Sequence, residues 1–95
     1  MFFFRRVVGD SMKPTLRDGQ IIFAHHVRSF KPGQVVVAHV GTREVIKRIT
    51  DIDHKGQVYI EGDNPHQSTD SRQYGKIVDT NIAGVVIWPR VNRSI

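Results

Sequence analysis

The stretch QVVVAHVGTREVIKRITD, residues 34–51, places two short runs rich in Val and Ile on either side of Gly41 and Thr42. Short apolar runs separated by turn residues are typical of β-strands rather than helices. We therefore expect strands over residues 34–39 and 44–51, and by the same pattern over residues 3–8, 20–26, 57–61 and 82–88. The predicted fold is mostly β, a small, highly twisted, mostly antiparallel sheet or partial barrel.

The size and composition of the chain predict one small globular domain over residues 1–95. Hydrophobic residues make up 39% of the 95 residues, enough for a packed core, and we find no repeat or linker that would divide the chain. There is no cysteine, which excludes disulfides, a thiolate metal site and a cysteine nucleophile.

The charge balance is basic, with 14 Lys and Arg against 9 Asp and Glu, but the basic residues are scattered. A solvated basic surface explains this better than a nucleic-acid site, so we expect no nucleic-acid partner. No apolar run reaches the ~20 residues that cross a bilayer. The opening MFFFRR, residues 1–6, leaves two interpretations, aromatic rings at a membrane interface or a first strand that packs its phenylalanines into the core.

A candidate nucleophile, Ser11, lies in the segment GDSMKPTL, residues 9–16, just after the first expected strand. Gly9 and Asp10 tolerate unusual backbone angles, so the turn can direct the serine hydroxyl and its own N–H toward one point. A developing oxyanion needs that pairing. The residues alone favour the alternative, in which Asp10 and Ser11 cap a short helical turn.

The candidate base is Lys47, which strand alternation places on the same face as Val45 and Ile49. If that face is the core, burial disfavours the ammonium and lowers its pKa. A base that works near neutral pH needs a pKa of roughly 7–8 instead of ~10.4. The alternative is a lysine that extends its amine to water.

The polar segment from Gly62 to Lys76 is too rich in Gly, Asp and Ser for a strand, and a loop of this length is typical of a functional site. Arg48 and Arg72 are the expected partners of Asp63 and Asp70. The Ser68 hydroxyl is the candidate that would orient a neutral Lys47.

Other catalytic arrangements have weaker support. The chain has no Gly-x-Ser-x-Gly elbow. Its five histidines show no metal-ligand spacing, and each is assigned to the surface or to a strand. We expect no metal and no cofactor.

Taken together, GDSMKPTL (residues 9–16), VIKRI (residues 45–49) and GDNPHQSTDSRQYG (residues 62–75) resemble the three conserved boxes of the signal peptidase I family. The resemblance implies the catalytic fold shared by signal peptidases and LexA-like domains. It also implies a serine endopeptidase in which Ser11 is the nucleophile, Lys47 the general base and the Ser11 N–H an oxyanion donor. By the same resemblance Ser68 orients the lysine, while the supporting pairs are Asp70 with Arg72 and Arg48 with Asp63. The residues that match its apolar substrate pocket are Val7, Met12, Leu16 and Ile46.

The resemblance further implies a precursor protein bound as an extended strand and cut after a small residue to release a leader, signal or pro-segment. Two branches stay open. A compact signal peptidase would be membrane-associated on the extracytoplasmic face. The proteases that mature nickel-type superoxide dismutase also contain Gly-Asp-Asn-Pro, the sequence of residues 62–65, and an enzyme of that kind would be cytoplasmic. Peripheral membrane contact fits the first branch.

Three departures from the family pattern stand out. Gly9 occupies a position where some members carry a serine as a second oxyanion donor. Only 14 residues separate Lys47 from Gly62, so the inserted β-domain of larger members is absent. The spanning helix of typical members is also absent, which indicates either a trimmed catalytic core or a naturally compact form.

Two other functions are alternatives. A self-cleaving LexA-type repressor domain shares the fold and dyad but needs a cleavage segment upstream of the serine, and only ten residues precede Ser11. A basic β-barrel that binds single-stranded nucleic acid needs aromatics interleaved with Lys and Arg, and this pattern is weak here.

Overall fold

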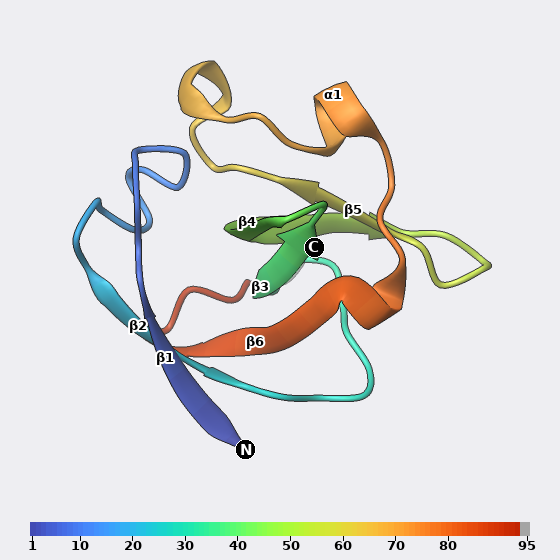
Figure 1. The fold of residues 1–95 in the computed structure, drawn as a ribbon, viewed down its shortest axis with the longest axis horizontal. Coiled ribbons are helices and arrows are strands. Elements are labelled where there is room, and N and C mark those ends of the chain that lie inside the picture. Colours follow the sequence, from blue (N-terminus) through green and yellow to red (C-terminus); the bar gives the residue numbers. More distant parts are fainter. Residues whose placement is uncertain (94–95) are drawn as a thin grey trace.

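The computed structural model describes residues 1–93, which contain one six-stranded antiparallel sheet (Figure 1). The mostly β prediction is confirmed. All six expected strands are present, and their ends differ from the prediction by at most two residues. The strands are β1 (Phe2–Arg6), β2 (Ile21–His25), β3 (Val35–Val40), β4 (Arg43–Ile52), β5 (Val58–Glu61) and β6 (Ile82–Trp88).

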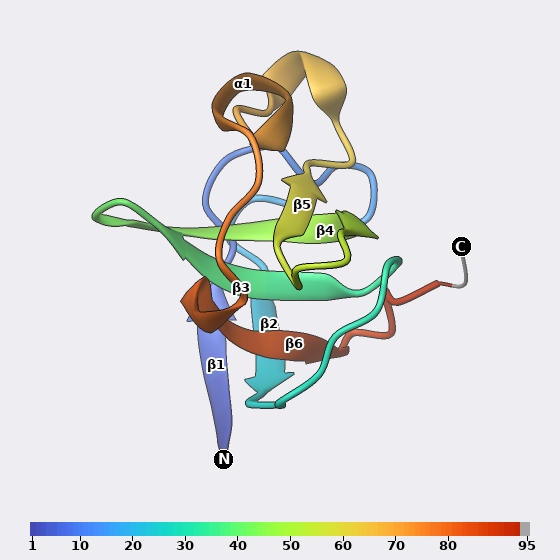
Figure 2. The ribbon, with the colours of Figure 1, turned by 90° about the vertical axis from the view of Figure 1, so that its right-hand side faces the viewer.

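The strand order is β1-β2-β6-β3-β4-β5, so the last strand is inserted between β2 and β3. The sheet does not close, and β1 and β5 are its edges. In Figure 2, β1 and β2 stand upright while β3, β4 and β6 run across the view, which shows how strongly the sheet bends. The structure is thus an open, highly twisted sheet.

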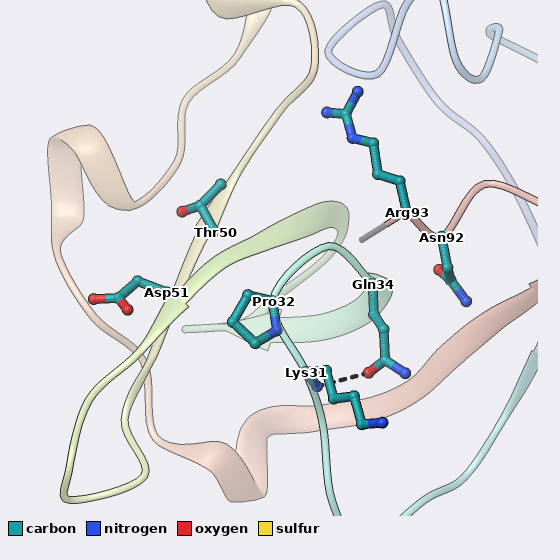
Figure 3. A pocket seen from close by; sticks show the side chains of 7 residues that line it. All are labelled: Lys31, Pro32, Gln34, Thr50, Asp51, Asn92 and Arg93. Atoms are coloured by element: carbon teal, nitrogen blue, oxygen red, sulfur yellow. Dashed lines mark hydrogen bonds between the residues drawn. The ribbon is translucent and has the colours of Figure 1, made fainter. Parts of the chain in front are cut away.

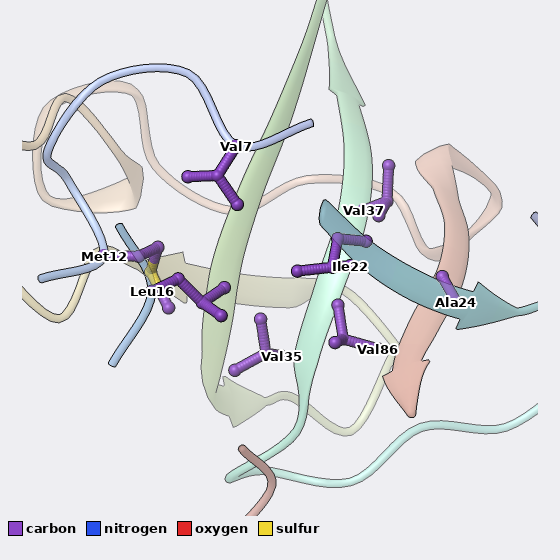
Figure 4. Close-up of a cluster of buried hydrophobic side chains, with 8 residues drawn as sticks. All are labelled: Val7, Met12, Leu16, Ile22, Ala24, Val35, Val37 and Val86. Atoms are coloured by element: carbon purple, nitrogen blue, oxygen red, sulfur yellow. The ribbon is translucent and has the colours of Figure 1, made fainter. Parts of the chain in front are cut away.

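Strand β3 is the centre of the core because both of its faces are covered. Val35 and Val37 belong to one buried cluster together with residues of the loop after β1, of β2 and of β6 (Figure 4). Val36 and Ala38 belong to a second cluster with residues of β4, β5 and β6. The period-two alternation of a strand explains this division. The run of valines therefore supplies apolar side chains to both clusters.

The polar segment 62–76 forms no strand, as expected, but it is more regular than the loop that the sequence indicated. It contains the 3-10 helix η1 (Pro65–Gln67) and the single-turn α1 (Ser71–Tyr74). Asp70 caps α1, and the Gln73 side chain accepts from the Asp70 backbone N–H in a reciprocal capping box. A further 3-10 helix, η2 (Asp79–Asn81), leads into β6.

The opening aromatic run is divided between the two faces of β1. Phe3 packs against the core, where Gly84 makes room for its ring, whereas Phe2 and Phe4 are 67% and 61% exposed. The expectation that the first strand packs its phenylalanines into the core is therefore correct only for Phe3. Among residues 1–93, no helix is long and apolar enough to cross a membrane.

Candidate active site

Ser11 and Lys47 line the same hollow, which has a volume of about 480 Å³. Three parts of the chain surround it: the turn after β1, the facing ends of β3 and β4, and the segment around α1. The lining residues are Val8, Gly9, Asp10, Ser11, Val40, Arg43, Val45, Lys47, Gln67, Thr69 and Tyr74. The structure therefore brings together the candidate nucleophile and the candidate base from segments far apart in the sequence.

The Ser11 turn is tied to the third motif through backbone groups. The Asn64 N–H donates to the Ser11 carbonyl at 2.8 Å, and the Asn64 side chain donates to the Asp10 carbonyl at 3.0 Å. A Cβ on Gly62 would lie 2.6 Å from the Ser11 carbonyl oxygen and 2.3 Å from Ser68 Oγ. Only glycine allows the two segments to approach this closely.

Lys47 is buried, with 5% of its surface exposed. It lies in β4 opposite Val36, on the side of the second core cluster, where Val45 and Ile49 also pack. Burial lowers the pKa of Lys47, and this effect outweighs the opposing attraction of Asp70. Two nearby arginines lower the pKa further. The amine is thus shifted toward the neutral form that a base requires.

The Lys47 amine is oriented by a short chain of hydrogen bonds. Lys47 Nζ donates to Ser68 Oγ at 3.0 Å, and Ser68 Oγ donates to Asp70 Oδ2 at 2.5 Å. A hydroxyl can donate only one hydrogen bond, and Ser68 donates it to the Asp70 carboxylate. Its oxygen can therefore only accept from Lys47, which leaves the lone pair of a neutral amine free for another proton.

Asp70 is fully buried and remains ionised because its hydrogen bonds outweigh the cost of burial. Arg72 donates to both carboxylate oxygens through Nε and Nη2, at 2.9 and 2.6 Å. The Gly62 and Arg72 backbone N–H groups add two more hydrogen bonds. These donors and Ser68 hold the pKa of Asp70 well below its usual range.

Arg48 forms the second expected ion pair, with Asp63. Its guanidinium contacts both Asp63 oxygens, and Nη1 also donates to the Gly33 and Val91 carbonyls at 2.8 and 2.7 Å. Thr15 donates to Asp63 as well. The pKa of Asp63 is lowered because these hydrogen bonds and positive charges outweigh its burial. The supporting role of both pairs in catalysis stays a prediction.

The four residues expected in an apolar substrate pocket lie together, in or against the first core cluster. Val7, Met12 and Leu16 are buried in the first core cluster, and Ile46 packs against the same cluster from the other face of β4. None of them lines the hollow that contains Ser11. Their assignment to a substrate pocket stays a prediction.

Several residues of the hollow were not singled out from the sequence. Val40 and Arg43 flank the turn between β3 and β4, and Tyr74 ends α1. No sequence signal separates these residues from ordinary hairpin and helix positions. Burial and the charge of Asp70 raise the pKa of Tyr74, so its hydroxyl stays protonated at neutral pH.

A larger hollow, about 670 Å³, lies elsewhere on the molecule, between the segment that leads into β3, the last residues of β4 and the end of the described chain (Figure 3). Its charged groups come from Lys31, Asp51 and Arg93, and it contains no serine. This second hollow is larger, but it is not the candidate active site, because it is not lined by a serine and a buried lysine. Within residues 1–93, no group of three or more His, Cys, Asp or Glu side chains could hold a metal ion.

The comparison with protein families agrees with this geometry. Residues 1–87 match the family described as Peptidase S24-like. The chain belongs to this family. The matched residues include the motifs that contain Ser11 and Lys47 and the polar segment that contains Ser68.

Individual relatives point to the same group of proteins. The chain is 30% identical to mitochondrial inner membrane protease subunit 1 of Mus musculus and 31% identical to that of Homo sapiens, over 85% of this chain in each case. It is 34% identical to the LexA repressor of Cellvibrio japonicus (strain Ueda107) over 66% of this chain. The chain spans 66% of the length of the two mitochondrial relatives and 32% of that LexA repressor.

These matches confirm the relationship to the signal peptidase I family that the three motifs indicated. They also place the chain among the serine-type peptidases at the level of the family.

Proposed function

We propose that this chain is a serine endopeptidase that uses a Ser11–Lys47 dyad to remove a leader, signal or pro-segment from a precursor protein. The observation that carries the proposal is the buried Lys47 amine, which donates to Ser68 while it lines the same hollow as Ser11. A serine hydroxyl is a poor nucleophile without a base. This lysine has the burial and the hydrogen bond that such a base needs.

The reaction we infer is acyl transfer. Ser11 Oγ attacks the carbonyl carbon of the scissile peptide while neutral Lys47 takes its proton. The Ser11 N–H stabilises the oxyanion that develops. Collapse of the tetrahedral intermediate breaks the C–N bond, and the leaving amine takes the proton from Lys47. Water, deprotonated by Lys47, then hydrolyses the acyl-enzyme and restores Ser11.

We assign the positioning of Lys47 to Ser68 and Asp70. Because Ser68 donates to Asp70, its oxygen accepts one amine proton, and this fixes the direction of the amine lone pair. The nearby positive charge of Arg72 is neutralised by Asp70, which limits its effect on the amine. The pocket residues Val7, Met12, Leu16 and Ile46 would act by shaping the wall behind the hollow.

The substrate we propose is an extended segment of a precursor with a small side chain at the cut. Main-chain pairing with strand edges is a common way to bind such a segment. The hollow offers apolar contacts from Val8, Val40 and Val45. Its volume of about 480 Å³ accommodates a few residues of extended chain rather than a folded protein.

Two substrate branches follow from the motifs. A signal peptidase-like enzyme would associate with a membrane and act on its extracytoplasmic side, and the name of the mitochondrial relatives supports membrane association. A maturation protease for nickel-type superoxide dismutase would act in the cytoplasm, and the sequence GDNP at residues 62–65 supports that branch.

Mass spectrometry of cleavage tests the proposal. The wild type, Ser11→Ala and Lys47→Met are incubated with a secretory precursor that carries an Ala-x-Ala cut site and with a nickel superoxide dismutase precursor, with and without detergent. We expect one cut that both substitutions abolish and that His66→Ala, at an exposed position of η1, retains. A cut that survives Ser11→Ala or Lys47→Met would contradict the dyad.

A second candidate is self-cleavage of the LexA type, which the match to a LexA repressor supports. Self-cleavage within one chain proceeds at a rate independent of protein concentration and leaves a separate precursor intact. A first-order shortening of the purified chain, abolished by Ser11→Ala, would favour this candidate over a precursor protease.

A further inference from the structure

The Asn64 side chain is bonded to the peptide group that carries the proposed oxyanion donor. Asn64 Nδ2 donates to the Asp10 carbonyl oxygen at 3.0 Å. That carbonyl belongs to the same peptide unit as the Ser11 N–H. The peptide bond between Asp10 and Ser11 is trans, so its C=O and N–H point in opposite directions. A hydrogen bond that fixes one end of this peptide therefore fixes the direction of the other.

The Ser11 N–H is available at that other end. Within residues 1–93 it donates to no backbone or side-chain acceptor, whereas the Lys13 N–H donates to the Asp10 carbonyl at 3.2 Å and closes the turn. Ser11 lines the candidate active-site hollow, and Asn64 does not. The N–H is directed away from Asn64, so it can donate to a group bound in the hollow.

Asn64 holds the peptide groups on both sides of Ser11. Its backbone N–H donates to the Ser11 carbonyl at 2.8 Å, while its side chain holds the Asp10 carbonyl. The two peptide planes that meet at the Ser11 Cα are thus both fixed by one residue. Because these planes define the φ and ψ angles of Ser11, the backbone of the candidate nucleophile is held in one conformation.

Local structure does not account for this use of the Asn64 amide. Asn64 is the N-cap residue of η1, where an asparagine side chain ordinarily accepts a hydrogen bond from the first turn. Here the side chain makes no capping hydrogen bond. It is half-buried, and it presents its N–H group to Asp10 because a carbonyl oxygen can only accept. The amide therefore stabilises the Ser11 turn rather than its own helix.

We propose that Asn64 is the positioning residue of the oxyanion site, which directs the Ser11 N–H toward the charge that develops on the scissile carbonyl oxygen. The proposal rests on the proposed function of Ser11 as the nucleophile and adds a residue to that reaction. A hydrogen bond accepted by a peptide carbonyl also polarises the N–H of the same peptide and strengthens it as a donor. Gly9, two residues before Ser11, has no hydroxyl that could share the charge, so the direction of this N–H matters more.

A kinetic test measures the contribution of the side chain alone. Asn64→Ala removes the hydrogen bond to Asp10, and Asn64→Asp replaces the donor by a carboxylate oxygen, which only accepts. Both variants keep the backbone N–H that holds the Ser11 carbonyl. For a precursor that the wild type cuts, we expect kcat to fall about tenfold or more, whereas outright loss of an oxyanion donor costs about 100- to 1000-fold. KM should change by less than about twofold, since the interaction is made only in the transition state.

A peptide aldehyde gives a readout that a purely structural role would not change. Ser11 Oγ adds to the aldehyde carbon and the Oγ proton passes to Lys47, so the former carbonyl oxygen becomes an oxyanion. The probes are an aldehyde that ends at the cut site of that precursor and the matching alcohol, which forms no oxyanion. In calorimetric titrations we expect both Asn64 variants to bind the aldehyde about tenfold or more weakly and the alcohol as the wild type does.

The matched control is Asn92→Ala. The Asn92 amide also joins distant backbone groups, with the Val35 N–H at 2.9 Å and the Val86 carbonyl at 3.1 Å, but Asn92 does not line this hollow. Its loss should lower the stability to a similar degree and leave kcat and the ratio of aldehyde to alcohol affinity unchanged. Urea denaturation of each variant verifies that the kinetics are measured on folded protein.

Two results would overturn the proposal. One is an unchanged kcat in both Asn64 variants. The other is an equal loss of affinity for the aldehyde and the alcohol, which would mean that Asn64 shapes the site before any charge develops.

Failure of the peptidase proposal is recognised separately, because the wild type would then cut no precursor. In that case the Ser11 amide resonance in nitrogen–proton NMR spectra decides about Asn64. An upfield shift in Asn64→Ala, caused by the lost polarisation of the peptide, would support the positioning of the Ser11 N–H. An unchanged resonance would contradict it.

Discussion

Arg48 and Asp63 form a bidentate ion pair that is almost completely buried, with Nε–Oδ1 and Nη2–Oδ2 distances of 2.9 and 2.7 Å. The two side chains are 3% and 8% exposed. The pair connects β4, one residue after Lys47, to the start of the segment that carries Ser68. It therefore ties the candidate base to the side chain that orients it.

Removal of Arg48 should be much more costly than removal of a surface arginine. Arg48→Ala leaves the Asp63 carboxylate buried without its main partner, and we expect a loss of about 3–5 kcal/mol in the free energy of unfolding. Arg5→Ala is the control, because Arg5 forms an exposed pair with Glu44 and should cost about 0–1 kcal/mol. Urea denaturation of both variants measures the difference, and equal losses would show that the buried pair contributes no more than a surface contact.

Replacement of Lys47 by methionine should stabilise the protein while it abolishes the proposed activity. Because the pKa of Lys47 is lowered on folding, the unfolded chain binds more protons between that lowered pKa and ~10.4. Wild-type stability should therefore rise with pH through this window. The advantage of Lys47→Met should be largest below the lowered pKa and shrink as the pH rises, as measured by urea denaturation at several pH values. A constant advantage would mean that Lys47 has an ordinary pKa.

Asp70→Asn should move the acidic limb of the activity profile to lower pH. The Asp70 charge raises the pKa of Lys47, whereas Arg72 lowers it, so loss of the carboxylate leaves the lowering effect unopposed. The measurement is the pH dependence of kcat/KM for a cleaved precursor. Total activity should also fall, since Ser68 loses its charged acceptor.

The same substitution should make stability less sensitive to acid. The pKa of Asp70 is held well below that of an unfolded aspartate, so its contribution is present above ~3.9 and is lost as the pH falls below that value. Asp70→Asn should flatten this part of the stability curve. An acidic limb that moves to higher pH, or an unchanged acid sensitivity, would contradict the assigned role of Asp70.

Gly62→Ala should destabilise the protein and also disrupt the site. Its Cβ would lie 2.3 Å from Ser68 Oγ, so the residue that orients Lys47 must move. We expect a loss of about 1–3 kcal/mol from this overpacking and a large decrease in kcat. Gly84→Ala is the matched control, because its Cβ would meet the Phe3 ring at 2.8 Å, and neither residue lines the hollow. Similar stability losses, with a large decrease in kcat only for Gly62→Ala, would show that the effect on kcat comes from the site and not from lost stability.

The sequence predicts the strands well because short runs of Val and Ile carry the strand period directly. It also places Lys47 on the face of Val45 and Ile49, but it left open whether the amine is buried or reaches water, and the structure shows that Lys47 is buried. The position of β6 between β2 and β3 was not predicted, because hydrophobic alternation does not say which strands are neighbours. The helical turn α1 was missed although Asp70 and Gln73 have the spacing of a capping box.

The contacts of the tail after β6 had no sequence signal. The Val91 carbonyl accepts from Arg48, and the Asn92 side chain accepts from the Val35 N–H and donates to the Val86 carbonyl. The first contact uses only a backbone carbonyl, which any residue can supply, and the other two join the Asn92 side chain to backbone groups of distant strands. Such contacts depend on the path of the chain rather than on residue type.

The burial of Lys47 has a consequence for the life of the newly made chain. In an unfolded polypeptide its amine has an ordinary pKa near ~10.4 and carries a proton that blocks it from acting as a base. The reactive form arises only after β4 is covered and the Ser68 segment has closed over it. Under the mechanism proposed for Ser11 and Lys47, a chain with this arrangement would be unable to cut a peptide bond until it has folded.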